Sequence, residues 1–161
     1  TSIAAARKIF NISDANIKNS MKKMRLKGRL EEIKSGKLKN LIGENRLIID
    51  GGHNINSAIS ISNWVKQQNK KVHLICGMMN DKPHKEFVNQ FENSVNSITL
   101  IDIPNQEGSI SKEEFKKKLG NKNIHTAESI EESLLMNNKD KNCIFLCAGS
   151  LYLAGEVLNL N

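Results

Sequence analysis

The sequence predicts an α/β domain, with a Rossmann-like, mostly parallel sheet and helices on both of its faces. Short apolar runs such as RLIID (46–50) and CIFLC (143–147) are typical of strands that are buried on both faces. Segments of helical length lie between these runs, so each strand is expected to reach the next through a crossover helix. A chain of 161 residues with 39% hydrophobic residues can bury one core of this kind.

The expected elements alternate regularly after two opening helices. These helices run from Thr1 to Phe10 and from Ser13, a good N-cap, to about Met24, and their position suggests a chain cut from something larger. A strand at 29–33 and a hairpin-like turn around 35–37 follow. The other predicted strands are 46–50, 72–76, 97–101, 123–125 and 143–147, and the other predicted helices are 56–68, 84–91, 111–119, 129–136 and 151–158.

The net charge of +7 is concentrated at the start of the chain. Residues 1–41 hold 11 Lys/Arg and 3 Asp/Glu, a balance of +8, whereas residues 42–161 hold 13 and 14, a balance of −1. No aromatic residue lies between Asn11 and Leu41, so the stacking groups of a nucleic-acid module are missing there and no nucleic-acid partner is expected. The basic stretch is either a solvated helical face or a rim that attracts polyanions such as nucleotide and polyglutamate.

The remaining features of the sequence argue against a membrane-spanning segment, a disulfide bond and a metal site. The sequence has no apolar run of 18 residues and no secretory signal layout, so a cytoplasmic protein without a membrane partner is expected. Cys76, Cys143 and Cys147 lie in apolar runs and are expected to be buried. On one strand, Cys143 and Cys147 would be about 13 Å apart, too far for a disulfide. The four histidines are scattered, which indicates no zinc site.

Two loops are candidates for a binding site. Residues 50–54 (DGGHN) follow a predicted buried strand and precede a helix, a position where parallel sheets bind ligands and helix N-termini bind anions. There Asp50 is suited to a ribose hydroxyl and His53 to phosphates or an incoming amine, although a mere turn is the alternative. Ser150 repeats this layout after the last strand, with simple helix capping as its alternative. If the strands are parallel, His53 and Ser150 should lie within about 10 Å at one sheet edge, with Arg29 beside them.

Four motifs together resemble those of folylpolyglutamate and dihydrofolate synthases, which belong to the Mur ligase superfamily. The most specific is GSLYLAGE, because the cell-wall Mur ligases share the DGGHN-type loop but not this ending. The resemblance implies that residues 1–27 are the end of a central ATPase domain with its linker, and that 28–161 are the C-terminal ligase domain. The motifs are GRLE (28–31), DGGHN (50–54), GMMNDK (77–82) and GSLYLAGE (149–156).

The resemblance implies an ATP-dependent ligase that adds L-glutamate to dihydropteroate or folate through an acyl phosphate. It implies that Arg29 contacts ATP phosphates, Asp50 binds the nucleotide, His53 acts near the phosphates and glutamate, and Ser150 holds glutamate. Lys82 is a weaker candidate for substrate binding, with a surface lysine as the alternative reading.

Neither a G-x-G-x-x-G motif nor a P-loop is present in the sequence. The resemblance implies that the phosphate cradle and the Mg²⁺ ligands lie in the missing N-terminal ATPase domain. The chain alone is therefore expected to be inactive. A cell-wall Mur ligase C-terminal domain, or a non-enzymatic nucleotide-binding or basic interaction module, are the alternatives.

Overall fold

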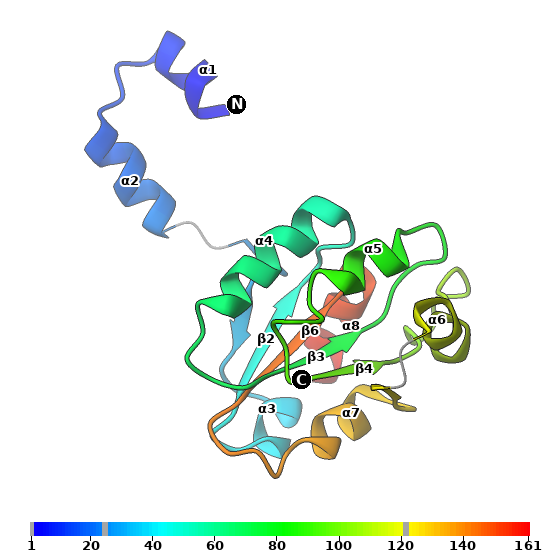
Figure 1. The fold of residues 1–161 in the computed structure, drawn as a ribbon. Helices are drawn as coiled ribbons and strands as arrows, with labels where there is room; N and C mark the ends of the chain where they lie inside the picture. The colour runs from blue at the N-terminus through cyan, green and yellow to red at the C-terminus, as the bar shows by residue number, and fades with distance from the viewer. Residues whose placement is uncertain (1, 24–25, 121–122) are drawn as a thin grey trace.

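A single six-stranded sheet organises the fold in the computed structural model, which describes residues 2–23, 26–120 and 123–161 (Figure 1). The strand order is β1-β2-β6-β3-β4-β5, and only β1 runs antiparallel to its neighbour. The predicted mostly parallel sheet is therefore confirmed. The strands are β1 (Glu31–Ile33), β2 (Arg46–Asp50), β3 (Val72–Cys76), β4 (Ser97–Leu100), β5 (Ile124–Thr126) and β6 (Ile144–Ala148).

Helices cover both faces of the sheet because consecutive strand residues point to opposite sides. In β2, Leu47 and Ile49 pack on one face and Ile48 on the other. Among the described helices, none has the length and apolar character needed to cross a bilayer. One face carries α4 (Ile55–Lys66), α5 (His84–Asn89) and α6 (Lys112–Leu119), and the other carries α3 (Lys37–Leu41), α7 (Ile130–Met136) and α8 (Leu151–Leu160).

The predicted hairpin-like turn around 35–37 is only the start of the connection between the antiparallel strands β1 and β2, because the short helix α3 follows the bend at 35–36. Leu38 is fully buried beneath the sheet, which gives this helix an apolar anchor. Its first N–H groups are capped from far along the chain: the backbone oxygen of Asn161 accepts from Lys37 N at 3.0 Å, and its side-chain oxygen accepts from Lys39 N at 3.2 Å. Such a distant cap leaves no local signal in the sequence.

The first strand begins two residues later than predicted. Gly28 and Leu30 have φ angles of 64° and 42°, which lie in the left-handed region and are incompatible with a strand. The peptide N–H of Leu30 donates to the carboxylate of Asp50 at 2.9 Å, a tertiary contact that holds this turn. Residues 28–30 therefore form a turn against the loop that follows β2.

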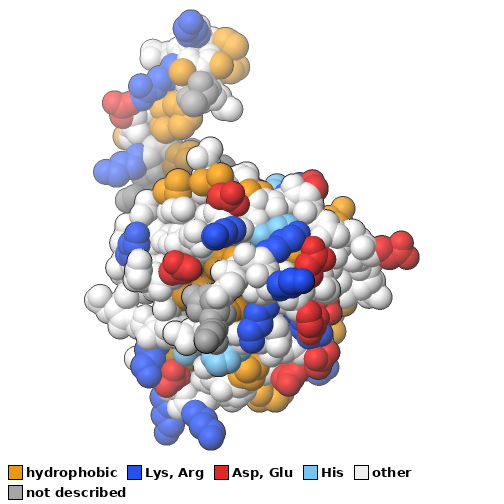
Figure 2. All heavy atoms as spheres, turned by 45° about the vertical axis from the view of Figure 1, so that its right-hand side comes forward, with side chains coloured by type: hydrophobic (Ala, Val, Ile, Leu, Met, Phe, Trp, Pro, Cys, Tyr) orange, Lys and Arg blue, Asp and Glu red, His pale blue; other side chains and the backbone are white. Residues whose placement is uncertain are grey.

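Helices α1 (Ser2–Ile9) and α2 (Asp14–Lys23) form an arm that extends away from the sheet domain (Figure 1). Thr1 and Met24, the predicted outer ends of these helices, lie outside the described residues. No described residue of α1 is buried, and Ile9 and Phe10 are 75% and 62% exposed. Figure 2 shows hydrophobic side chains beside Lys and Arg on this arm. The arm thus carries apolar surface that the domain does not cover.

All three cysteines are free and buried, as predicted. Burial raises the pKa of the Cys147 thiol to about 12, so the thiolate is not populated near neutral pH. Cys143 lies just before β6, at the end of that strand opposite Ser150. The cysteines are therefore core residues rather than reactive groups.

A buried histidine ties together the amino ends of β3 and β4. His73 Nδ1 lies 2.8 Å from Ser97 Oγ, and its Nε2 lies 3.0 Å from a carboxylate oxygen of Asp140. An ionised carboxylate only accepts, so Nε2 carries the proton and Nδ1 accepts from the serine hydroxyl. Lys71 donates to the other Asp140 oxygen at 2.9 Å, and this bond lowers the pKa of Asp140.

We expect the free energy of unfolding to decrease as the pH falls below about 6.5, the ordinary pKa of histidine. Burial lowers the pKa of His73 in the folded state, so the unfolded state takes up the proton first and is favoured by acid. Burial lowers the pKa of His84 in the same direction. Urea unfolding from pH 8 down to about pH 5 measures the decrease. The variant His73→Gln should flatten it, and an unchanged pH dependence in that variant would contradict this assignment.

Candidate functional site

Three loops meet at the carboxyl ends of β2, β6 and β3, which are neighbours in the sheet. The N–H of Gly149 donates to the carbonyl of Gly52 at 3.0 Å, joining the loops after β6 and β2. Gly149 has a φ of 115°, and a Cβ there would lie 2.8 Å from the carbonyl oxygen of Gly77 in the loop after β3. Only glycine fits this junction, which brings the three loops together.

A pocket of about 290 Å³ opens at this junction. His53 and Ser150 line the same pocket, so the prediction that they meet at one edge of the sheet is confirmed. Lys82, the weaker candidate, lies there as well. The complete lining is His53, Met79, Asp81, Lys82, Ser150, Leu151 and Tyr152.

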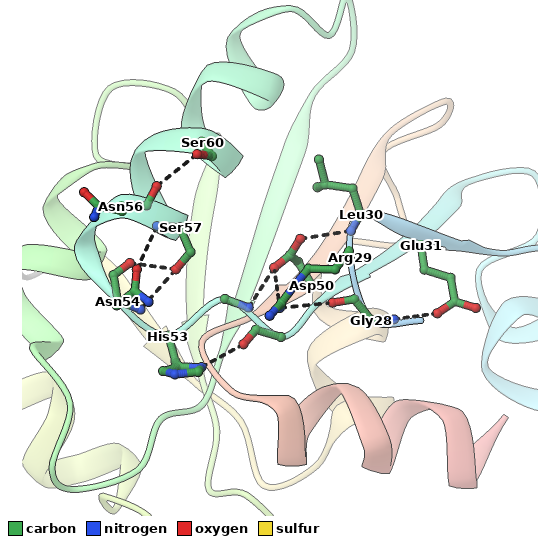
Figure 3. A network of polar contacts seen from close by, with 12 residues as sticks. Gly28, Arg29, Leu30, Glu31, Asp50, His53, Asn54, Asn56, Ser57 and Ser60 are labelled. Carbon is green, nitrogen blue, oxygen red and sulfur yellow. Dashed lines mark hydrogen bonds and ion pairs between the residues drawn. The ribbon is translucent and has the colours of Figure 1, made fainter. Parts of the chain in front are cut away.

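The ring of His53 is oriented by the loop that carries it. Its Nδ1 lies 2.9 Å from the carbonyl oxygen of Gly51, as Figure 3 shows. A carbonyl oxygen only accepts, so Nδ1 carries a proton in this contact. In the neutral ring, Nε2 then holds a free lone pair. His53 is therefore set up to accept a proton on Nε2.

The loop that carries His53 passes directly into a capped helix. The side chain of Asn54 accepts from Ser57 N at 2.9 Å, and Asn54 N donates to Ser57 Oγ at 3.0 Å (Figure 3). This capping box fixes where α4 begins. The residues between β2 and α4 are thereby held at both ends, and His53 is held with them.

Ser150 caps α8 and also lines the pocket. Its hydroxyl oxygen accepts the N–H of Tyr152 at 3.1 Å, the contact expected of an N-cap. The side chain has little contact with solvent, since the residue is 2% exposed. Because the cap uses the oxygen as an acceptor, the hydroxyl proton is available to donate. The capping alternative and the binding role are thus compatible.

An ion pair forms one side of the pocket. Lys82 Nζ lies 2.6 Å from a carboxylate oxygen of Asp81, and this hydrogen bond lowers the pKa of Asp81. No role was predicted for Asp81, or for Tyr152 in the first turn of α8. Their positions just after β3 and β6 were the available signal, because the loops after parallel strands share one edge.

Asp50 is enclosed by the loops rather than open to the pocket. Its residue is 5% exposed, and its two oxygens accept the N–H groups of Leu30 at 2.9 Å and Gly52 at 2.7 Å (Figure 3). Arg29 Nη1 lies 3.7 Å from the same carboxylate. The carboxylate therefore ties the turn before β1 to the loop after β2.

Arg29 reaches the site from the other side of Gly51. Its side chain is 47% exposed and lines a separate cavity of about 570 Å³ together with Lys27 and Trp64. A Cβ added to Gly51 would lie 3.2 Å from Arg29 Nη1 and 2.1 Å from Leu151. Arg29 is thus adjacent to the loop of the pocket but does not line the pocket itself.

The charged groups suit anions better than a metal ion. Across residues 2–23, 26–120 and 123–161, no group of three or more His, Cys, Asp or Glu side chains is arranged to hold a metal. Arg29 offers a planar guanidinium and Lys82 an ammonium, both of which are suited to phosphate or carboxylate oxygens. This chain therefore supplies cationic and hydrogen-bonding groups and no metal ligand set within that part of the structure.

A comparison with known protein families identifies the family of the chain. The family model described as Mur ligase, glutamate ligase domain, matches residues 28–151, which include the turn before β1 and all three loops of the site. The chain belongs to the Mur ligase family. The match to this Mur ligase domain begins at Gly28, whose carbonyl accepts the N–H of Gly51 in the loop after β2.

Individual relatives of this Mur ligase domain are longer proteins. It is 24% identical over 166 residues to a dihydrofolate synthase/folylpolyglutamate synthase of Buchnera aphidicola, covering 99% of the chain and 38% of the relative. The bifunctional folylpolyglutamate synthase/dihydrofolate synthase of Yersinia pestis superposes with a TM-score of 0.74 at 19% identity, covering 92% of this chain and 34% of that one.

Escherichia coli FolC in complex with ADP superposes with a TM-score of 0.75 at 20% identity, covering 98% of this chain and 37% of FolC. The chain thus spans little more than a third of these relatives. At such identities the superpositions establish the fold, and the predicted fold class agrees with them.

Proposed function

We propose that this Mur ligase domain is the C-terminal part of an ATP-dependent ligase that joins L-glutamate to dihydropteroate or folate through an acyl phosphate. The observation that carries the proposal is the convergence of His53, Lys82 and Ser150 on one pocket at the carboxyl edge of the sheet. The sequence relative named for dihydrofolate and folylpolyglutamate synthase supports this choice of acceptor.

The pocket groups fit the handling of an amino acid that attacks as an amine. Lys82 supplies a positive charge for a glutamate carboxylate, and the Ser150 hydroxyl donates a hydrogen bond to it. The free Nε2 of His53 takes the proton that the amine loses as its nitrogen bonds to the acyl carbon. Phosphate then leaves as the C–O bond to it breaks, so the residues act by positioning, charge and proton transfer.

We assign the binding of the nucleotide to the turn before β1 and the carboxylate that holds it. Arg29 places its guanidinium where phosphate charge develops, and two or more oxygens can be bound by its planar fork. Asp50 already accepts two backbone N–H groups, and a carboxylate has about four acceptor positions, which leaves capacity for a ribose hydroxyl. Similar solved structures hold ADP, or AMPPNP with a manganese ion.

We assign residues 1–27 to the end of a central ATPase domain and its linker, and 28–161 to the C-terminal ligase domain. An apolar cavity of about 200 Å³ between α1 and α2, together with exposed Ile9 and Phe10, calls for a covering partner. The remainder of that ATPase domain is the proposed cover, and it would also provide the phosphate cradle and the Mg²⁺ ligands. We place the intact ligase in the cytoplasm.

The test is ADP release by the intact protein that contains this chain, measured with and without L-glutamate. We expect glutamate-dependent release with dihydropteroate or folate, and none with a cell-wall precursor. Ser150→Ala in the intact protein should raise the KM for glutamate more than that for ATP. Release with the cell-wall precursor alone would assign the protein to cell-wall synthesis, and nucleotide binding without any ligation would indicate a non-enzymatic module.

A further inference from the structure

The turn before β1 is fastened at both ends by carboxylates. Glu31 Oε2 accepts the N–H of Gly28 at 2.7 Å, and Asp50 Oδ2 accepts the N–H of Leu30 at 2.9 Å. Between them, the carbonyl of Gly28 accepts the N–H of Gly51 at 2.7 Å. Figure 3 shows these contacts around Arg29, the middle residue of the turn. The N–H of Arg29 itself donates to the carbonyl of Leu26 at 3.2 Å, so its backbone is held together with those of its neighbours.

The turn needs this support because its backbone is unusual. Leu30 has a φ of 42°, a conformation that costs a residue with a Cβ free energy unless surrounding contacts hold it. The Asp50 bond holds the Leu30 side of the turn, and the Glu31 bond holds the Gly28 side. Hydrogen bonds to a charged acceptor are among the stronger ones in proteins. Losing the Glu31 bond would leave the Gly28 N–H without this carboxylate acceptor, while the Gly28 carbonyl would keep its bond to the N–H of Gly51.

The position of the Arg29 side chain depends on this turn. Arg29 Nη1 lies 3.2 Å from where a Cβ of Gly51 would be, so the guanidinium is packed closely against the loop that leads to His53. Its half-exposed side chain makes two long contacts: Nη1 lies 3.7 Å from a carboxylate oxygen of Asp50 and donates to the carbonyl of Gly28 at 3.5 Å. These side-chain contacts hold Arg29 weakly, so the position of its guanidinium depends on the fixed backbone of the turn.

We infer that Glu31 is a positioning residue: its carboxylate fixes the Gly28 turn and so aims the Arg29 guanidinium over the loop after β2. This inference rests on the proposed function for its effect on catalysis, but its structural part does not.

Three variants test this role in the intact protein. Glu31→Ala removes the bond and should lower kcat about tenfold, the loss expected for one hydrogen bond to a charged group, with a smaller change in the KM for glutamate. Glu31→Gln keeps an oxygen that accepts from Gly28 N and should restore most of the activity. Glu32→Ala is the matched control, because Glu32 bonds to Arg46 instead and is adjacent on the same strand.

A second measurement separates this inference from the proposed function. In the 161-residue chain, hydrogen exchange of the Gly28 amide, followed by NMR, should be about tenfold faster in Glu31→Ala and near normal in Glu31→Gln and Glu32→Ala. Unchanged Gly28 protection in Glu31→Ala would overturn the inference, as would full activity of that variant. If the intact wild-type protein shows no glutamate-dependent ADP release, the proposed function fails, and the exchange data still decide the role of Glu31.

Discussion

The 161-residue chain by itself is expected to show no glutamate-dependent turnover and to bind ATP weakly or not at all. Its cationic groups line one wall of a site, and its sequence has no P-loop to enclose the phosphates. The pocket beside Ser150 holds only about 290 Å³, and Arg29 faces a separate cavity. Titration calorimetry with ATP and a phosphate-release assay with glutamate and each pterin acceptor measure both properties.

The intact protein is the control for this prediction, assayed in the same buffer and at the same concentrations. It should bind ATP and turn over, because under the proposed function the ATPase domain supplies the rest of the site. Micromolar ATP affinity in the chain alone, or any turnover that depends on glutamate, would contradict a site divided between two domains.

Arg29→Ala in the intact protein should lower kcat by about 100-fold to 1000-fold, with a smaller change in the KM for glutamate. A preorganised donor that faces developing oxyanion charge typically contributes about 2.7 to 4 kcal/mol to the transition state. The Arg29 guanidinium is half exposed at the edge of the loop after β2, with its Nη1 3.7 Å from a carboxylate oxygen of Asp50. Steady-state kinetics with varied ATP and varied glutamate separate the two constants.

Two further variants distinguish Arg29 from the general basic charge around it. Lys27 lines the same cavity, so Lys27→Ala removes an equal charge and should change kcat by no more than about threefold, as for a solvated surface charge. Arg29→Lys keeps the charge but not the planar fork and should remain clearly impaired. Equal effects of Lys27→Ala and Arg29→Ala would reduce Arg29 to part of a diffuse basic surface.

Strands and loop positions could be predicted from the sequence because burial on both faces leaves continuous apolar runs. The run at 46–50 forms β2 with the predicted bounds, and the loop after it meets the loop after β6 as expected for parallel neighbours. The same logic places His53 and Ser150 together without any knowledge of their side-chain contacts. Sequence periodicity is informative here because the sheet, not local preference, determines where these loops emerge.

Features held by distant contacts could not be predicted in this way. Helix α3 depends on a cap from Asn161, and the turn before β1 depends on the carboxylate of Asp50. Each partner lies at least 20 residues away from the group it holds, so no local window contains both. The position of Arg29 outside the His53 pocket could not be predicted either, because it depends on how Gly51 packs between the Arg29 guanidinium and Leu151.

The glycine junction at Gly149 limits how substrate preference can change in this domain. Its N–H bonds to the loop after β2, and it leaves no room for a Cβ beside the Gly77 carbonyl in the loop after β3, so shifting one loop displaces the other two. Backbone remodelling of a single loop would therefore disturb all the functional groups together. Redesign toward a different amino acid has more freedom in side chains that reach the pocket without belonging to the junction, such as Met79 and Tyr152. Natural or laboratory variants should differ mainly at these side chains, while the backbone conformation of the three loops stays the same.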